Sequence, residues 1–161
     1  MHRIRPLARL APVILAAACG DPATADRGAA PKPGPASKQL LLGSWQADFP
    51  ASWAISKDAF LKDTLRGAAA YPKDPAEREQ AIHDEMQAFV GSMRLRLGAD
   101  DQATMSVQGK DQSGKWQVLA TDGRSMQVKL IGREYTFAFQ SDDEVHMTNK
   151  GKKPTTIVWH R

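Results

Sequence analysis

The sequence contains a single cysteine, Cys19, so the chain can form no internal disulfide. It also lacks an apolar run of roughly 20 residues, the length that a membrane-spanning helix requires. No Gly-x-Ser-x-Gly nucleophile turn, His-Glu-x-x-His zinc motif or phosphate-binding glycine loop is present. These absences argue against a permanent membrane helix and against the common motif-bearing enzymes, and we expect neither catalysis nor a cofactor.

A strong excess of one charge is missing as well. The chain has 22 Lys and Arg residues against 18 Asp and Glu residues, but Arg3, Arg5 and Arg9 lie in its first 18 residues. Without that segment 19 basic and 18 acidic side chains remain, which is a net charge of +1. Nucleic-acid-binding proteins typically carry a basic surface, so we expect no nucleic-acid partner.

The first 18 residues are typical of an export signal. Three arginines form a positively charged start, and residues 10–18 form a short apolar stretch that ends in small residues. We therefore expect residues 1–18 to be a signal peptide that is removed from the mature protein.

The sequence Leu15-Ala16-Ala17-Ala18-Cys19-Gly20 resembles the lipobox of bacterial lipoproteins. The resemblance implies cleavage before Cys19 and a lipid anchor on its thiol, with palmitate-type acyl chains that hold the protein on a membrane of the cell envelope. Gly20 in place of aspartate implies the outer membrane more than the inner one. The alternative is an ordinary signal peptide with an incidental cysteine. Once acylated, Cys19 would leave the folded part with no thiol for catalysis, zinc binding or redox switching.

Residues 19–38 are rich in Ala, Pro, Gly and Lys and have almost no large apolar side chains. Such a segment buries too little surface to fold, and its prolines make it a semi-extended spacer. We expect it to tether one domain, residues 39–161, which is long enough for a single core.

Short segments of alternating apolar and polar residues fill the second half of the chain. Met126, Val128 and Leu130 alternate with polar neighbours, and the pattern recurs within residues 93–97, 104–108, 135–139, 145–148 and 156–160. This period marks strands with one buried and one solvated face. Turn sequences such as Gly109–Gly114 and Asp122-Gly123 separate the strands. The pattern predicts an α+β fold, mostly antiparallel β: a curled meander or small barrel of about seven or eight strands.

Two helices are expected between the first and second strands. Ser56 would cap a short helix that runs to about Arg66. The second helix has a clearer start, with Asp74 as N-cap, Pro75 at the first helical position and Glu77 completing a capping box. It is expected to bury one apolar stripe, formed by Ile82, Met86, Phe89, Val90 and Met93.

The first strand, expected from Leu40 to Trp45, contains Gly43-Ser44-Trp45. This Gly-x-Trp, followed by a helix pair and a meander, resembles the calycin group, which includes lipocalins and fatty-acid-binding proteins. The resemblance implies that the tryptophan closes the barrel base, that the helices act as a lid, and that an arginine lies across the tryptophan, for which Arg161 is the candidate. The chain lacks the tyrosine of the lipocalin turn motif at residues 121–124, and the C-terminal Arg-x-Tyr pair of fatty-acid-binding proteins.

Large apolar side chains are expected inside the barrel, where two interpretations stay open. They line a cavity for a small apolar ligand, or they simply fill the core. The residues concerned are Trp45, Phe89, Met105, Met126, Phe137, Phe139 and Trp159.

Histidines offer metal hypotheses with simpler alternatives. Glu79 and His83 lie one helical turn apart, a spacing that two ligands of one metal can share, but no further ligand is fixed nearby and a solvated helix face is the preferred explanation. His146 and His160 near Met147 raise a copper site, but the strand period directs His146 away from Met147. We therefore expect no metal.

Charged residues offer two further hypotheses. Asp100-Asp101 and Asp142-Asp143 are candidate carboxylate pairs, but both lie where turns are expected and aspartate is a common turn residue. Arg94, Arg96, Lys110 and Lys115 share either a solvated sheet face or a shallow patch for an anionic partner.

Taken together, these features predict a lipid-anchored, non-enzymatic binding domain of the cell envelope. Its partners are expected to be the membrane, through the anchor, and either a small apolar ligand inside the barrel or an envelope protein on its outer face. An envelope enzyme would require a cleft with convergent polar groups.

Overall fold

The computed structural model describes residues 35–62 and 67–161, so the expected signal peptide, Cys19 and most of the tether lie outside the described residues. The elements are, in chain order, α1 (Lys38–Leu41), β1 (Gly43–Asp48), α2 (Phe49–Lys62), the short 3₁₀ helix η1 (Ala68–Ala70), α3 (Pro75–Val90), β2 (Arg94–Leu97), β3 (Gln102–Val107), β4 (Lys110–Asp122), β5 (Ser125–Leu130), β6 (Arg133–Phe139), β7 (Glu144–Asn149) and β8 (Thr156–His160).

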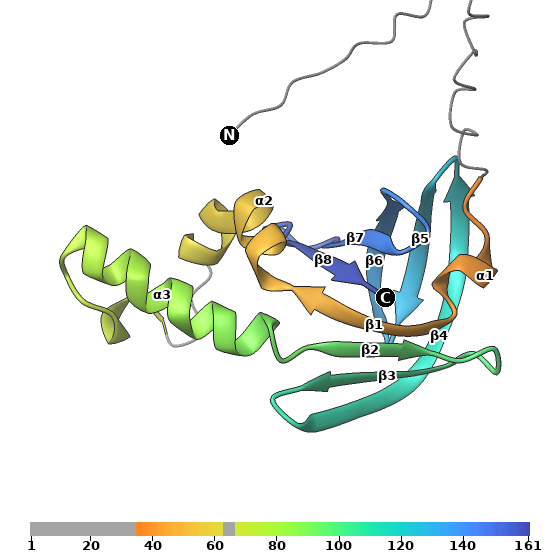
Figure 1. Ribbon diagram of the computed structural model, residues 1–161, viewed down its shortest axis with the longest axis horizontal. Coiled ribbons are helices and arrows are strands. Elements are labelled where there is room, and N and C mark those ends of the chain that lie inside the picture. The colour runs from red at the N-terminus through yellow and green to blue at the C-terminus, as the bar shows by residue number, and fades with distance from the viewer. Residues whose placement is uncertain (1–34, 63–66) are drawn as a thin grey trace, which may run out of the picture. The chain divides into compact units, whose positions relative to one another are not determined.

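The eight strands form a closed antiparallel barrel in which each strand pairs with its neighbours in sequence (Figure 1). Closure comes from β1 and β8, where Gln46 lies opposite His160 and Asp48 lies opposite Val158. An up-and-down order of this kind leaves few sheet edges free. The predicted α+β class, the small barrel and the two helices between the first and second strands are confirmed.

Alternation along the strands separates a buried core from a solvated outer face. On β5, Met126, Val128 and Leu130 are at most 1% exposed, whereas Gln127 and Lys129 between them are exposed. The same period recurs in β2, β6 and β7. The barrel interior is therefore apolar, and the polar residues of the strands face outward.

Helix α2 begins earlier than the sequence predicts. It starts at Phe49, because the carboxylate of Asp48 accepts the backbone N–H of Ala51 at 3.0 Å and so caps the helix. The predicted cap, Ser56, instead lies inside α2 with its side chain buried. The predicted end at Arg66 falls outside the described residues.

Two buried serines of α2 complete the hydrogen bonding of β8. Strand β1 ends at Asp48, opposite Val158, so the earlier part of β8 has no strand beside it on that side. Ser52 Oγ accepts the backbone N–H of Val158 at 2.9 Å, and Ser56 Oγ both accepts from and donates to the backbone of Thr156, each at 2.9 Å. Helix α2 thereby replaces the missing length of β1.

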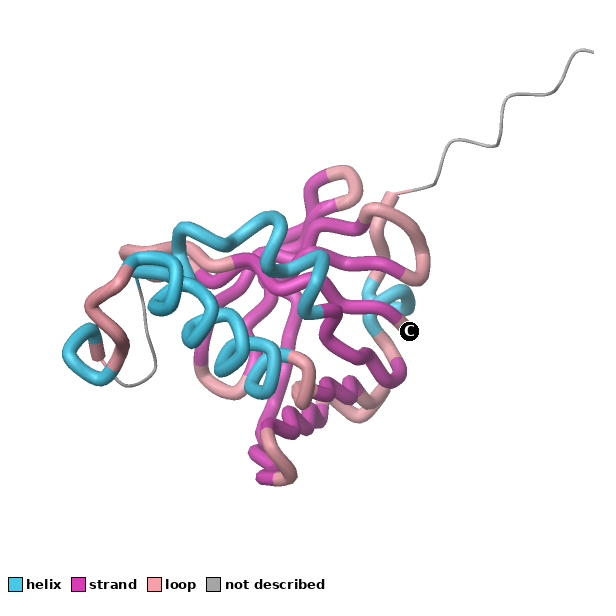
Figure 2. Tube along the Cα trace, turned by 60° about the vertical axis from the view of Figure 1, so that its left-hand side comes forward, coloured by secondary structure: helices cyan, strands magenta, loops and turns pink. Residues whose placement is uncertain are grey.

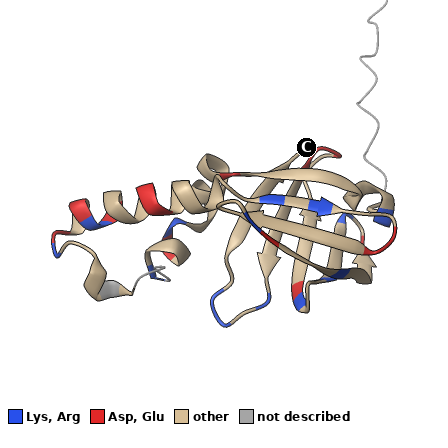
Figure 3. Ribbon diagram, turned by 90° about the horizontal axis from the view of Figure 1, so that it is seen from below, with Lys and Arg blue, Asp and Glu red and all other residues tan. Residues whose placement is uncertain are grey.

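Helix α3 starts where the sequence predicts. The carboxylate of Asp74 accepts the N–H groups of Ala76 and Glu77, each at 3.0 Å, and Pro75 occupies the first position. Helices α2 and α3 pack together beside the barrel (Figure 2), and red segments along α3 in Figure 3 mark its acidic side chains. None of the helices in the described ranges is long and apolar enough to cross a membrane.

The first strand is shorter than predicted. Residues 38–41, expected to enter a strand at Leu40, form the one-turn helix α1, and the strand begins at Gly43. Leu41 is fully buried, and its carbonyl accepts the indole N–H of Trp45 at 2.9 Å. This contact holds α1 against the first strand, and leucine is itself a good helix former, so the leucine run is helical rather than extended.

Strand β4 is longer than predicted. Residues Gly109–Gly114 were expected to form a connection, but the turn consists only of Gln108 and Gly109, with φ angles of 50° and 74°. Positive φ at both positions is typical of a two-residue hairpin turn. The strand then starts at Lys110, and its first residues are polar on both faces. They therefore show no alternation of apolar and polar residues from which a strand could be predicted.

Candidate functional site

Large side chains pack the interior of the barrel. Most of the residues predicted to line a cavity or fill the core are at most 4% exposed, namely Trp45, Met126, Phe137, Phe139 and Trp159. Trp45 meets Phe139 edge to face, with ring centroids 6.4 Å apart. Phe89 and Met105 are partly exposed. The structure brings the set into one core, and the hypothesis that these residues form the walls of a ligand cavity stays a prediction.

Three tryptophans lie in this core, and their indole N–H groups differ. Trp45 donates to the Leu41 carbonyl, and Trp116 donates to the Gly98 carbonyl at 3.0 Å. The N–H of Trp159 is buried, and no described residue accepts a hydrogen bond from it. Since buried donors in proteins are normally paired, this group is available to an acceptor. Trp116 was missed as a core candidate, although Gly-x-Trp repeats there.

One end of the barrel, termed here the base, is formed by α1, Trp45 and Arg161. The Arg161 guanidinium lies over the Trp45 ring, 4.6 Å from its centroid, and donates to the Leu40 carbonyl. Lys38 lies 5.0 Å from the centroid of the Trp116 ring. The arginine that the calycin resemblance places across the tryptophan is therefore present.

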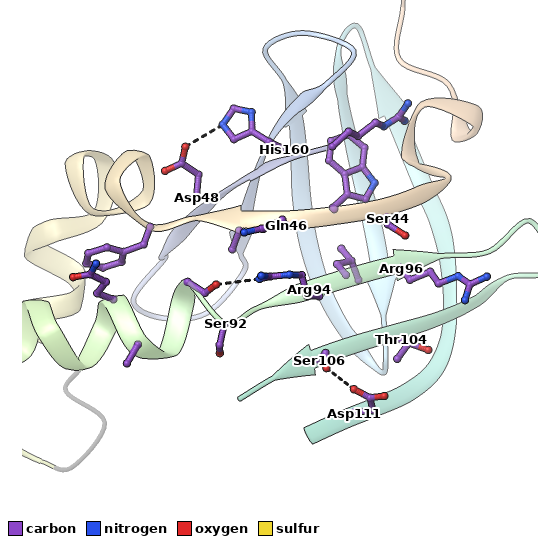
Figure 4. A pocket seen from close by; sticks show the side chains of 18 of the residues that line it. Ser44, Gln46, Asp48, Ser92, Arg94, Arg96, Thr104, Ser106, Asp111 and His160 are labelled. Carbon is purple, nitrogen blue, oxygen red and sulfur yellow. Dashed lines mark hydrogen bonds and ion pairs between the residues drawn. The ribbon is translucent and has the colours of Figure 1, made fainter. Parts of the chain in front are cut away.

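A groove crosses the outer face of β1, β2 and β3 and reaches the end of α3 (Figure 4). Its volume of about 1370 Å³ exceeds the roughly 300–1,000 Å³ of a small-molecule pocket, so it has room for a segment of a larger partner. The floor consists of the outward-facing polar residues of the three strands, which are Ser44, Gln46, Arg94, Arg96, Thr104 and Ser106.

The two arginines of the groove differ in whether their guanidinium groups already have hydrogen-bond partners. Arg94 donates to the carbonyls of Gly91 and Met93, at 3.0 and 2.9 Å, beside the C-terminal end of α3, where a cation complements the helix dipole. Arg96 lies opposite Ser44 on β1, and its side chain has no hydrogen-bond or ion-pair partner among the described residues. Its guanidinium is a planar, permanently charged set of donors, and it is free to bind an anionic group.

The four basic residues that the sequence placed on neighbouring strands do not gather in one patch. Lys115 faces outward but lines a second hollow with Asp100 and Lys129. Lys110 lies opposite Val107 at the tip of the β3–β4 hairpin and follows its inner side. The predicted anionic-partner patch is thus reduced to Arg94 and Arg96.

His83 lies between the two helices rather than on a solvated face. Its ring centroid is 5.0 Å from that of Phe49 and 4.9 Å from that of Trp53. Glu79 forms an ion pair with Lys57 and does not join His83 in a shared metal site. Within residues 35–62 and 67–161 no three His, Cys, Asp or Glu side chains converge as a metal site would require.

Two further histidines, His146 and His160, and the paired aspartates lie on the outside of the barrel. His146 Nε2 lies 2.9 Å from the Glu144 carboxylate, and His160 Nε2 lies 3.3 Å from that of Asp48. Met147 points inward and is buried, away from His146, as the strand period predicts. The two aspartate pairs occupy the β2–β3 and β6–β7 connections.

A closed barrel of eight antiparallel strands, a helix pair after β1 and an Arg–Trp base are consistent with a calycin-like barrel. No protein-family description and no curated protein matches the chain. Among solved structures, the chain is similar to the crystal structure of a DUF4847 family protein from Bacteroides vulgatus, at 16% identity and a TM-score of 0.43. The match covers 75% of this chain and 93% of that one. A likeness of this size assigns neither family nor activity.

Proposed function

We propose that this protein is a lipid-anchored envelope protein that binds a partner, without catalysis, in the groove over β1, β2 and β3. One contrast carries the proposal. The barrel interior is packed around Trp45, Trp116 and Trp159, each at most 2% exposed, whereas the outer face holds a groove of about 1370 Å³. A filled barrel has its outer surface available for recognition.

The anchor rests on the N-terminal sequence. The basic start, the short apolar stretch and the small residues before Cys19 together favour export and acylation. At roughly 3.1 Å per residue, an extended proline-rich tether from Cys19 would reach about 50 Å. Ala36 is bound to the barrel by a hydrogen bond from its N–H to the Gly123 carbonyl at 2.8 Å, so the tether leaves the domain beside the base.

The chemistry of the groove favours a partner segment with anionic and hydroxyl groups. Arg96 supplies an uncommitted guanidinium, and Ser44 and Thr104 supply hydroxyls on the strands to either side. Arginine binds carboxylates and phosphates through two parallel hydrogen bonds. The nearly neutral net charge outside the first 18 residues means that recognition depends on this local arrangement rather than on long-range attraction.

A photo-crosslinking experiment tests the groove. A photoreactive residue in place of Ser44, in the full chain expressed in growing cells, is expected to yield one dominant protein adduct. Arg96→Glu should abolish the adduct, because it reverses the charge on the groove floor. Lys129→Glu makes the same charge change on the outer face of β5 and should leave the adduct intact. An adduct that survives Arg96→Glu contradicts the groove as the binding site.

The anchor is tested separately with Cys19→Ala. The wild-type chain should partition with membranes and carry a diacylglyceryl mass on its N-terminal peptide, and the variant should lose both. A variant that remains in the membrane fraction would show that another feature holds the protein there.

The second candidate function is the binding of a small apolar ligand inside the barrel. The observation that favours it is the buried N–H of Trp159, which has no acceptor among the described residues. A ligand carbonyl or hydroxyl in the core would supply one. Mass spectrometry of an organic extract of the purified protein decides between the two. A stoichiometric apolar molecule favours this candidate, and an empty extract from folded protein favours the groove.

A further inference from the structure

The two halves of strand β4 pair with different neighbours, and neither half has a strand on both sides. Residues Trp116–Asp122 pair with β5, whereas the first half of the strand, Lys110–Lys115, pairs with β3 alone. Strand β5 ends at Leu130 because Ile131 and Gly132 turn the chain with φ angles of 48° and 80°. This leaves a split between the first half of β4 and the β5–β6 turn, where the β3–β4 hairpin extends past the rest of the sheet (Figure 1).

Two hydrogen bonds at the end of the split show to which side the backbone groups of β4 point. Trp116 donates its N–H to the Asp101 carbonyl beside β3, at 2.9 Å. Ile131 donates its N–H to the Lys115 carbonyl on the opposite side of β4, also at 2.9 Å. Because backbone groups of successive residues in an antiparallel strand point to opposite sides, odd-numbered residues of this half direct theirs into the split.

The residues concerned are Asp111 and Ser113. No residue in the described ranges 35–62 and 67–161 pairs with their backbone N–H or C=O groups. Such a row of donors and acceptors is a template for an added strand. Both side chains face outward, where Asp111 accepts from Ser106 and Ser113 lies 3.1 Å from Thr104.

The inner side of the split is only partly apolar, because Lys110 and Gln112 of β4 lie on that side. Met105, Val107 and Ile131 nearby are partly exposed apolar side chains. Met105 and Val107 lie opposite Gln112 and Lys110, one strand away from the free edge. An added strand would therefore place its inward side chains beside Lys110 and Gln112, close to Ile131, and its outward side chains beside the exposed carboxylate of Asp111.

We propose that the first half of β4 binds an extended segment of a partner protein by strand addition. The segment carries a basic side chain beside Asp111, where opposite charges on adjacent strands attract, and apolar side chains on its inner face toward Ile131 and, beyond β4, Met105 and Val107. A second copy of this chain fits less well, because its own edge would add a second Asp111 to the outer face and a second Lys110 to the inner face, where like charges on adjacent strands repel. The inference rests on the proposal that the barrel binds its partner from outside, and Ser106 and Asp111 also border the groove.

The test uses a synthetic peptide of alternating valine and lysine with the purified full chain in mild detergent. Before peptide is added, the amides of Asp111 and Ser113 should exchange with deuterium quickly, and those of Gln112 and Gly114 slowly. Millimolar peptide should slow exchange at Asp111 and Ser113. Ser113→Pro removes one donor at an edge that tolerates proline and should weaken peptide binding at least about tenfold.

Ser113→Ala is the matched control, because it removes the same hydroxyl and keeps the amide, and it should bind the peptide like the wild type. Equal binding by Ser113→Pro and Ser113→Ala, or no protection of Ser113 at millimolar peptide, would overturn the proposal. Protection that rises with protein concentration alone would assign the edge to a second copy and also overturn it. If Ser113→Pro keeps the cellular adduct that Arg96→Glu abolishes, the edge proposal fails and the groove proposal stands.

Discussion

The base and the split of the barrel differ in whether backbone groups that no neighbouring strand pairs with find another partner. At the base, α1 presents carbonyls that accept hydrogen bonds from Trp45 and Arg161, so α1 and the residue that follows β8 are held together at the core. At the split, the backbone groups of Asp111 and Ser113 have no partner among the described residues. Closure is thus a local property of each strand pair, and one barrel can combine a sealed, stabilising end with an end open to pairing.

The largest effect should come from removing the ring at the centre of the base. Trp45→Ala deletes a side chain that is 2% exposed and leaves a cavity beside Phe139. We expect a loss of about 3–5 kcal/mol in the free energy of unfolding, measured by urea denaturation. Leu119→Ala on β4 is the control, because Leu119 is 42% exposed and its loss should change stability by at most about 0.5 kcal/mol. If the two variants lose the same free energy of unfolding, the contacts at the base do not stabilise the fold.

The next effect concerns the helix that replaces part of β1. Ser52→Ala leaves the buried N–H of Val158 without its acceptor, and we expect a cost of about 1–3 kcal/mol in the same denaturation experiment. Ile55→Ala on the exposed side of α2 should cost little, since Ile55 is 52% exposed. If Ser52→Ala is neutral, α2 does not serve as a continuation of the sheet.

A smaller loss in the free energy of unfolding should follow from removing the Arg161 side chain at the surface of the base. Arg161→Ala removes the cation over the Trp45 ring and the hydrogen bond to the Leu40 carbonyl, for a combined loss of about 1–2 kcal/mol. Arg161→Lys keeps the charge but not the planar fork and should recover only part of the loss. Full recovery with lysine would show that charge alone holds α1 in place.

The smallest effect is expected at the split. Gln112→Ala removes an exposed side chain from the free half of β4 and should change the free energy of unfolding by no more than about 0.5 kcal/mol. A cost comparable to that of Ser52→Ala would mean that this half of the strand is part of the stabilising sheet, and the contrast between base and split would disappear.

The sequence predicts the parts of the fold whose burial is one-sided. Strands such as β5 alternate between core and solvent, so Met126, Val128 and Leu130 reveal both the strand and its inner face. The first half of β4 escapes prediction for the opposite reason. With residues such as Asp111 and Ser113 and only one neighbouring strand, it has no apolar period to read.

The candidate site is predicted less completely than the fold. Arg94 and Arg96 stand out in the sequence because they alternate with buried leucines. The groove around them also needs the end of α3 and the last residues of β8, which the chain supplies from distant positions. Ser52 and Ser56 have one sequence signal, their spacing of one helical turn, but their partners on β8 follow only from where β1 stops.

The contact between Arg161 and α1 has a mechanical consequence for an anchored molecule. Arg161 donates a hydrogen bond to the short helix α1, which directly follows the tether, and Trp45 of β1 donates another to the same helix. If Cys19 carries the proposed lipid anchor, tension from the membrane would enter the domain at α1 and would work against its contacts with Trp45 and Arg161. Because tension needs a second point of attachment, a partner bound in the groove or at the β3–β4 hairpin would pull against the anchor through these same contacts.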